Sequence, residues 1–152
     1  MSDNGSLFVG SDEPIDAVAV WLSDVLGLQI MAGGGDEVRL RGRSSGGGDW
    51  MGFVVRRNGH VEVDPEPEDV QAIEAYPVEV DIRFRGDEVL RREALVVFEK
   101  VVGARPDLPV LLLHNLALLV AAYLPGAGTK YFGAGTTPDG PDLAVWEPWV
   151  VR

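Results

Sequence analysis

The residues of this chain that could do chemistry are few, and their spacing matches no catalytic motif. There are two histidines, His60 and His114, and no cysteine. His60 would share a strand face with Glu62, but a metal site needs three or four converging ligands. The run from Gly126 to Lys130 lacks the Gly-Lys-Ser/Thr order of a phosphate-binding loop. The sequence therefore predicts no catalytic residue, no metal site and no cofactor, and gives no support to enzymatic activity.

His114 is the stronger candidate of the two histidines, because it stands where a buried strand is expected to end. Val110–Leu113 is a continuous apolar run, typical of a strand covered on both faces, and ligand sites often form where such strands end. A histidine there can equally hydrogen-bond a free backbone group. We keep a small-molecule site or active site near His114 as the alternative hypothesis. Its expected residues are His114, Asn115, Tyr123 and Tyr131.

Charge limits the choice of partner more than any motif does. The 152 residues include 24 acids and 13 bases, which gives a net charge of −11. Such a surface repels phosphate backbones and anionic lipids, so we expect no binding to nucleic acid or to a membrane. A basic protein is the expected partner. Lys100 and Lys130 are the only lysines among the bases, a bias that we interpret as the composition of a bacterium with a GC-rich genome.

The acids concentrate in residues 62–81, here called the acidic segment, which holds eight acidic residues and no basic one. Pro65 and Pro67 stiffen its centre and so lower the entropy lost when a loop docks. The segment is either a solvated rim that keeps the protein soluble or a preformed anionic surface that attracts a basic partner. On the second interpretation, the partner-binding residues are Glu62, Asp64, Glu66, Glu68, Asp69 and Glu74.

Hydrophobic periodicity predicts a single α+β domain over residues 1–152, with residues 1–6 as a disordered tail. Strands are expected at 7–10, 37–41, 50–57, 78–85 and 110–113, helices at 12–26, 69–76, 87–103 and 116–123, and an irregular strand at 143–151. Asn58-Gly59 predicts a type I′ hairpin between residues 50–57 and 61–63. The expected fold is a mixed, mostly antiparallel sheet with two to three helices packed on one face.

The sequence also indicates a cytoplasmic location. The first residues lack the basic and apolar regions of a secretory signal, and the absence of cysteine suits a reducing compartment. The apolar stretch Leu108–Leu124 is shorter than the roughly 20 residues that span a bilayer. Pro109, His114 and Asn115 also interrupt it.

In its overall profile the chain resembles the immunity proteins that neutralise toxins of polymorphic and contact-dependent systems. The shared profile is a small, acidic, cysteine-free α+β domain without catalytic residues. The resemblance covers the whole chain and involves no particular motif, so it transfers no residue of that family to this sequence. It implies a non-enzymatic bacterial inhibitor that binds a toxin with a basic surface.

Overall fold

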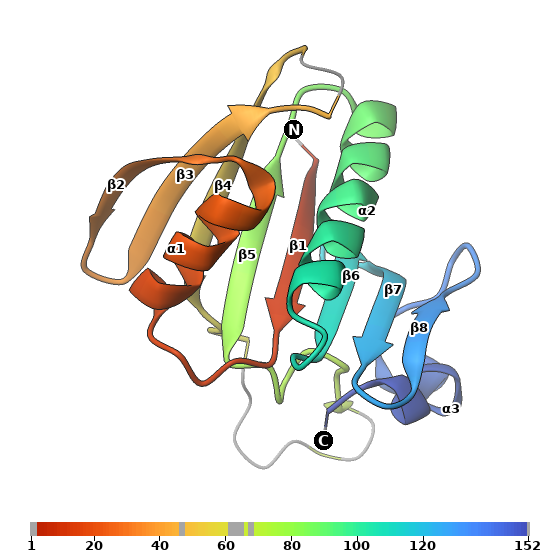
Figure 1. Cartoon of the computed structure of the whole chain (residues 1–152). Coiled ribbons are helices and arrows are strands. Elements are labelled where there is room, and N and C mark those ends of the chain that lie inside the picture. The colour runs from red at the N-terminus through yellow and green to blue at the C-terminus, as the bar shows by residue number, and fades with distance from the viewer. Residues whose placement is uncertain (1–2, 46–47, 61–65, 67–68, 152) are drawn as a thin grey trace.

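The computed structural model describes residues 3–45, 48–60, 66 and 69–151. In this part of the chain, eight antiparallel strands form one open sheet in the order β2-β3-β4-β5-β1-β6-β7-β8, as Figure 1 shows. The strands are β1 (Asn4–Val9), β2 (Gln29–Gly34), β3 (Glu37–Arg43), β4 (Trp50–Arg57), β5 (Val78–Arg83), β6 (Val110–His114), β7 (Leu118–Leu124) and β8 (Gly128–Tyr131). The helices are α1 (Ile15–Leu26), α2 (Asp87–Ala104) and α3 (Leu143–Trp146), with short 3-10 turns at Gly140–Asp142 and Glu147–Trp149. The α+β class is confirmed, and each pairing between the described strands is antiparallel.

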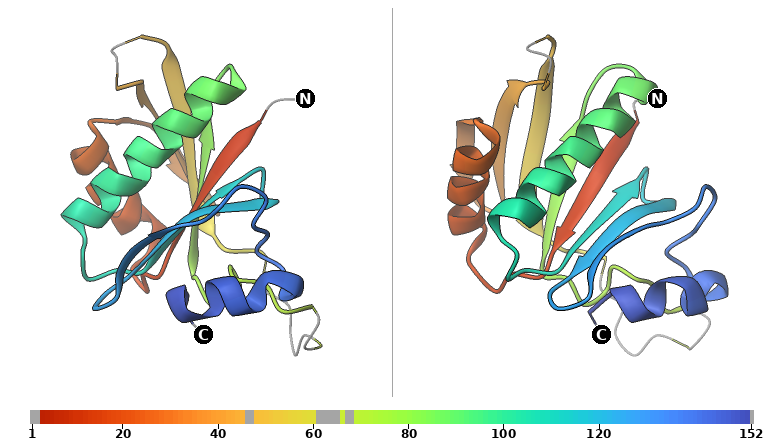
Figure 2. Two further views of the ribbon diagram at one scale, coloured as in Figure 1. Left: turned by 90° about the vertical axis from the view of Figure 1, so that its right-hand side faces the viewer. Right: turned by 45° about the vertical axis from the view of Figure 1, so that its right-hand side comes forward.

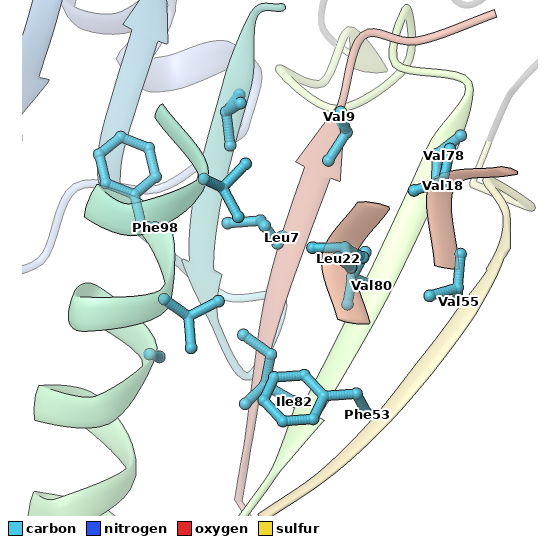
Figure 3. Packing of buried hydrophobic residues seen from close by; sticks show 14 of the residues in the cluster. Leu7, Val9, Val18, Leu22, Phe53, Val55, Val78, Val80, Ile82 and Phe98 are labelled. Carbon is cyan, nitrogen blue, oxygen red and sulfur yellow. The ribbon is translucent and has the colours of Figure 1, made fainter. Parts of the chain in front are cut away.

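The first core lies between the sheet and the two long helices. Strand side chains alternate between faces, so one set from β1, β3, β4, β5 and β6 packs with α1 and α2. Figure 3 shows the part of this set that comes from β1, β4 and β5. Its members include Leu7, Val9, Phe53, Val55, Val78, Val80 and Ile82 from the sheet, and Val18, Leu22 and Phe98 from the helices. Each fully buried side chain of this size contributes about 1.5–3 kcal/mol relative to exposure.

α1 ends where its sequence indicates, but it begins at Ile15 and not at residue 12. Pro14 precedes the first turn, where a missing N–H costs no hydrogen bond. Gly27 adopts the left-handed conformation with φ 66° and its N–H donates to the Ser23 carbonyl. The Leu28 N–H donates to the same carbonyl at 2.9 Å. These two bonds close the helix end and direct the chain into β2.

Gly27→Ala is expected to destabilise the protein by about 1 kcal/mol, because an L side chain is strained at this φ. Gly103→Ala is the matched control, since Gly103 lies inside α2, its φ is not positive and a Cβ there would meet no atom within 4 Å. Alanine is the better helix former, so the control should stabilise by roughly 0.5–1 kcal/mol. Urea denaturation of both variants checks the opposite signs; equal effects would contradict the role assigned to Gly27.

A second core covers the opposite face of β1, β6 and β7. Phe8, Leu111 and Leu113 point to this side and pack with Tyr76 and Trp146, which are all fully buried. Tyr76 comes from the connection between β4 and β5, and Trp146 from α3, which lies away from the two long helices in Figure 2. The expectation of two to three helices on one face therefore holds for α1 and α2, while α3 packs on the other face.

The second core gives the protein a predicted sensitivity to alkali. Burial raises the pKa of Tyr76 to about 12 from 10.0, although the Val151 N–H that donates to its hydroxyl works in the opposite direction. Between these pH values the unfolded chain loses the phenolic proton while the folded chain keeps it. The free energy of unfolding should therefore fall by about 2–3 kcal/mol as pH rises through this window. Tyr76→Phe should remove that part of the slope in urea titrations; parallel profiles for the two proteins would refute the assignment.

Several expected elements differ from the structure. Residues 4–6 of the expected tail form the start of β1, and β1 lies between β5 and β6 in the sheet. Residues 29–34 form β2 and residues 128–131 form β8, where no element was expected, and residues 143–149 are helical where an irregular strand was expected. Trp146 of this last segment is buried in the second core. Residues 72–75 form turns where a helix was expected.

The predicted hairpin at Asn58-Gly59 is wrong. Neither residue has a positive φ, which a type I′ turn requires at both central positions. β4 already has β3 and β5 as neighbours, and the expected partner residues 61–63 lie outside the described part. Positive φ values instead occur at Asn115 (52°) and Leu116 (56°). These two residues lie in the turn between β6 and β7. Leu118–Leu124 form strand β7, so the helix predicted at 116–123 is wrong.

Candidate functional site

Two carboxylates are buried on the sheet face opposite the long helices. Glu79 and Asp81 are each 3% exposed, and on β5 they alternate with Val78, Val80 and Ile82 of the first core. The alternation was predicted from the sequence, but the burial of the two acids was not. Burying a carboxylate costs several kcal/mol unless cations and hydrogen bonds compensate it. The partners of these two groups therefore determine what the site can do.

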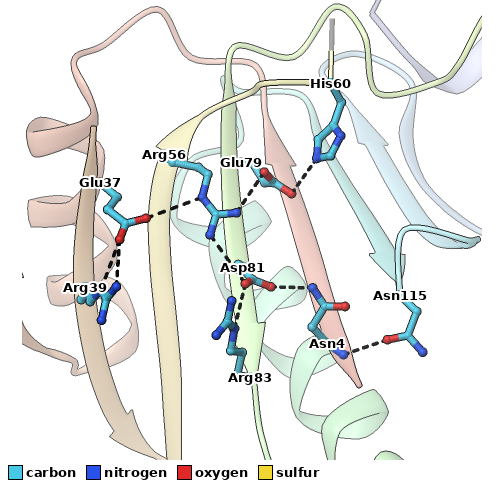
Figure 4. Close-up of polar contacts among 9 residues, drawn as sticks. All are labelled: Asn4, Glu37, Arg39, Arg56, His60, Glu79, Asp81, Arg83 and Asn115. Carbon is cyan, nitrogen blue, oxygen red and sulfur yellow. Dashed lines mark hydrogen bonds and ion pairs between the residues drawn. The ribbon is translucent and has the colours of Figure 1, made fainter. Parts of the chain in front are cut away.

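Arg56 on β4 is the central cation of this cluster (Figure 4). Its Nη1 donates to Glu79 Oε1 at 3.4 Å, and its Nη2 lies 3.8 Å from Asp81 Oδ2. The pairing follows from register, because Arg56 is directly opposite Glu79 in the β4–β5 ladder. Arg83 Nε donates to Asp81 Oδ2 at 2.9 Å. Two guanidinium groups thus balance the two buried carboxylates.

Uncharged and weakly basic groups complete the surroundings of the carboxylates. Asn4 Nδ2 donates to Asp81 Oδ1 at 2.7 Å, and the Asn4 backbone N–H donates to Asn115 Oδ1 at 2.8 Å. His60 Nε2 lies 3.4 Å from Glu79 Oε2. Both acids are fully engaged, and no group of three or more possible metal ligands occurs in the described residues. The cluster fixes β1, β4 and β5 to one another.

The acidic segment is divided by the fold into an inner and an outer part. Glu79 and Asp81 form the inner part described above. Glu66 and Asp69 are exposed, whereas Glu74 is half-buried and accepts the Gln71 backbone N–H at 3.0 Å. The predicted residues Glu62, Asp64 and Glu68 lie outside the described residues. Of the predicted partner-binding set, the structure therefore places two carboxylates on the surface and uses a third to hold a turn.

Residues 69–76 of the connection between β4 and β5 are anchored at two points. Asn58 Nδ2 donates to the carbonyls of Ile73 and Tyr76, both at 2.8 Å. Gln71 Nε2 donates to Asp139 Oδ1 at 2.9 Å, which ties the connection to the segment before α3. Ile73 and Tyr76 are buried in the second core. Residues 69–76 thus have fixed positions relative to the sheet.

The alternative site near His114 is not assembled as expected. His114 is buried and its Nε2 lies 3.3 Å from Asn115 Nδ2. Tyr123 pairs with Val110 at the other end of β6, and its hydroxyl donates to the Pro106 carbonyl at 2.6 Å. Tyr131 is exposed on β8.

A cavity does adjoin His114, but it is small. Its volume is about 80 Å³ and its lining consists of Gly5, Arg91, Ala94, Leu112, Leu113, His114 and Val120. Pockets for drug-sized ligands usually measure about 300–1,000 Å³. The cavity gathers neither tyrosine with the histidine, so it gives the small-molecule hypothesis no specific support.

The sheet face beside the carboxylates carries a group of arginines that the sequence analysis did not single out. Five arginines from three neighbouring strands share this face: Arg39, Arg41, Arg43, Arg56 and Arg83. Trp50, which is 47% exposed, lies under two of them. The Arg43 guanidinium is 3.8 Å and that of Arg41 4.5 Å from the ring centroid. In the sequence, the arginines at alternate positions 39, 41 and 43 of an expected strand could have indicated that their side chains share one face.

Comparisons with known proteins find no match among protein-family models, curated proteins or solved structures. The fold itself defines the class of protein: an α+β domain with an open antiparallel sheet, covered by two long helices on one face and partly covered on the other. No helix in the described residues is long and apolar enough to cross a membrane.

Proposed function

We propose that this chain is a non-enzymatic protein-binding domain whose acidic segment meets a basic surface on a partner protein. The observation that carries the proposal is the sorting of the carboxylates. The inner acids are paired with Arg56 and Arg83, whereas Glu66 and Asp69 are exposed. No ion pair joins either outer acid to a cation in the described residues. Their charge is therefore available to a partner.

Two properties of the chain support this role. The net charge of −11 attracts a basic surface over distances of about a Debye length, roughly 8–10 Å at ordinary ionic strength. The anchors at Asn58 and Gln71 hold residues 69–76, and with them Asp69, in place before any partner arrives. A preformed surface loses less conformational entropy on binding than a mobile one. Both properties favour fast, electrostatically steered association.

In its specific form, the proposal assigns the chain to toxin immunity. The protein would act in the bacterial cytoplasm, where it would bind a toxin with a basic surface and block it. This form is supported by the overall profile of the sequence and by the separation of paired inner acids from exposed outer acids. It predicts that co-expression of this chain protects cells from the toxic product of a neighbouring gene.

Charge reversal of the outer acids tests the proposal. With the neighbouring gene product as the binding probe, Glu66→Lys with Asp69→Lys should slow association by about tenfold at low salt and weaken its salt dependence. Asp24→Lys with Glu99→Lys is the matched control, since it changes the net charge equally at exposed positions on α1 and α2. Stopped-flow association rates distinguish the cases. If the two double variants slow association equally, the effect comes from the net charge alone, and the assignment of the acidic segment as the binding surface is overturned.

A further inference from the structure

Gly52, in the middle of β4, has no role in the packing of the described residues. β4 is in regular register with β3 and β5 at this position, so there is no bulge. The φ of Gly52 is not positive, and an added Cβ would meet no heavy atom of the described residues within 4 Å. Glycine weakens a strand interior and often marks a place where a ligand or another backbone approaches closely.

At two other strand glycines, Gly5 and Gly42, a side chain would collide with or crowd another side chain of this chain. A Cβ added to Gly5 would lie 3.2 Å from the Cβ of Ala94, where α2 crosses β1. A Cβ added to Gly42 would lie 2.5 Å from Leu28 Cδ2. Both glycines make room for this chain's own side chains. Because Gly52 makes room for none, the space above it is open to another molecule.

Arginine and tryptophan side chains surround this space. Gly52 is directly opposite Arg41 on β3 and directly opposite Arg83 on β5. Trp50 precedes it on the same face of β4, where Arg41 and Arg43 stack on the indole ring. Gly52 is thus a position without a side chain between Arg41 and Arg83 in the cross-strand register, next to Trp50 on the same sheet face, and this part of the face is here called the Gly52 hollow.

The charge in the Gly52 hollow is only partly compensated. Arg83 is paired with Asp81. Arg41 donates to the Gln29 amide oxygen at 3.4 Å and Arg43 to the Gly48 carbonyl at 3.0 Å. No carboxylate of the described residues forms an ion pair with Arg41 or Arg43. These two guanidinium groups retain donors for a ligand that carries carboxylates.

We propose that the Gly52 hollow is a docking site for an acidic, extended segment of a partner protein. Arg41 and Arg43 are same-face neighbours on β3, so their Cα atoms are about 7 Å apart, as in alternate residues of an extended peptide, and both guanidinium groups lie against the Trp50 ring. Alternate carboxylates of such a peptide can therefore pair with both arginines while its backbone crosses Gly52. Trp and Arg are also the residue types that contribute most to binding at protein interfaces.

The occupant is a protein segment and not a nucleic acid. A nucleic acid would extend its phosphates beyond the hollow and across a molecule with a net charge of −11. In a short acidic segment, by contrast, all the negative charges can lie close to the arginines. The Gly52 hollow is distinct from the acidic segment, and its proposed ligand is acidic, whereas the proposed partner of the acidic segment is basic. The docking site proposed here and the function proposed above can therefore fail independently.

The test uses the whole chain and a labelled synthetic peptide in which glutamate and threonine alternate. Fluorescence anisotropy should show saturable binding, and Arg41→Ala or Arg43→Ala should each weaken it by about tenfold. Arg92→Ala, at an exposed position on α2, is the matched control and should have no effect. Gly52→Val should weaken binding by at least about tenfold while the melting temperature stays equal or rises, because valine is a good strand former.

Three results would overturn the proposal. The first is equal binding of the peptide in which glutamine replaces glutamate. The second is unchanged affinity of Gly52→Val, which would show that nothing approaches the backbone there. The third is tighter binding of oligothymidylate that is lost in the same arginine variants, which would make the hollow a nucleic-acid site. The melting temperature of each variant confirms that the protein remains folded in the assay.

Discussion

Arg56→Ala is expected to lower the free energy of unfolding by about 2–4 kcal/mol, a large fraction of the stability of an ordinary domain. The variant leaves Glu79 and Asp81 buried without their shared cation, and Arg83 alone cannot balance both charges. Breaking a buried pair costs about 3–5 kcal/mol in general. We expect somewhat less here, since the Arg56 side chain is 32% exposed and water can partly replace it.

Arg39→Ala is the matched control for this experiment. Its pair with Glu37 is on the same sheet face, but the two side chains are 66% and 38% exposed, and pairs of this kind contribute about 0–1 kcal/mol. Urea denaturation of both variants gives the comparison. Adding Glu79→Gln and Asp81→Asn to Arg56→Ala should recover part of the lost stability. Equal losses in the two single variants would show that the cluster is not buried as the structure has it.

Trp146→Ala should destabilise the protein by about 3–5 kcal/mol. The indole is fully buried in the second core, and its Nε1–H donates to the Asp139 carbonyl at 3.0 Å. Its removal leaves a cavity against Phe8 and Tyr76 and an unpaired carbonyl. Trp149→Ala is the control, because Trp149 is only partly buried in the same cluster, and we expect a loss of about 1 kcal/mol.

Hydrogen exchange provides the more informative readout for Trp146→Ala. The second core joins residues 70–76 and the C-terminal helical turns to β1, β6 and β7. Amides in those two segments should lose protection first, while amides of β3, β4 and β5 should follow the global stability. Uniform loss of protection across the sheet would show that the two cores unfold as one unit, and would contradict a separate contribution from the second.

The elements that sequence reasoning predicted well are those whose side-chain pattern has one dominant period. β4 was predicted with its observed bounds, and β5 and α1 were predicted within a few residues. In β5 the alternation of valine with acids allows only one orientation towards the first core. In α1 the apolar stripe and Gly27 define both the face and the end of the helix. Here local pattern and tertiary packing agree.

The errors occur where local pattern and packing disagree. Residues 116–123 are apolar on every side, and such a run suits a buried helix or a strand covered on both faces equally well. The turn that decides the matter has Leu116 with a φ of 56°, a conformation that leucine rarely adopts. Leu116 packs against the second core, and only the tertiary structure reveals that contact. The Asn58-Gly59 signal was wrong because β4 pairs with a strand that begins at residue 78.

The candidate site could be predicted only in part for a similar reason. Composition identified an acidic segment, but the partition between paired and exposed acids depends on cross-strand register. Glu79 is neutralised because it is opposite Arg56. The Gly52 hollow likewise depends on Arg41 and Arg83, which are far apart in sequence and meet only because β3, β4 and β5 are neighbours.

The position of β1 has a consequence for how the chain is made. β1 pairs on one side with residues 78–83 and on the other with residues 110–114, so neither of its edges can be satisfied until those residues leave the ribosome. At about 5–20 residues per second, the strand waits several seconds or longer with both edges unpaired. Its sequence, Asn-Gly-Ser-Leu-Phe-Val, is apolar at one end and short. During translation both edges of this strand therefore remain open to other strands until the chain has been made to residue 114.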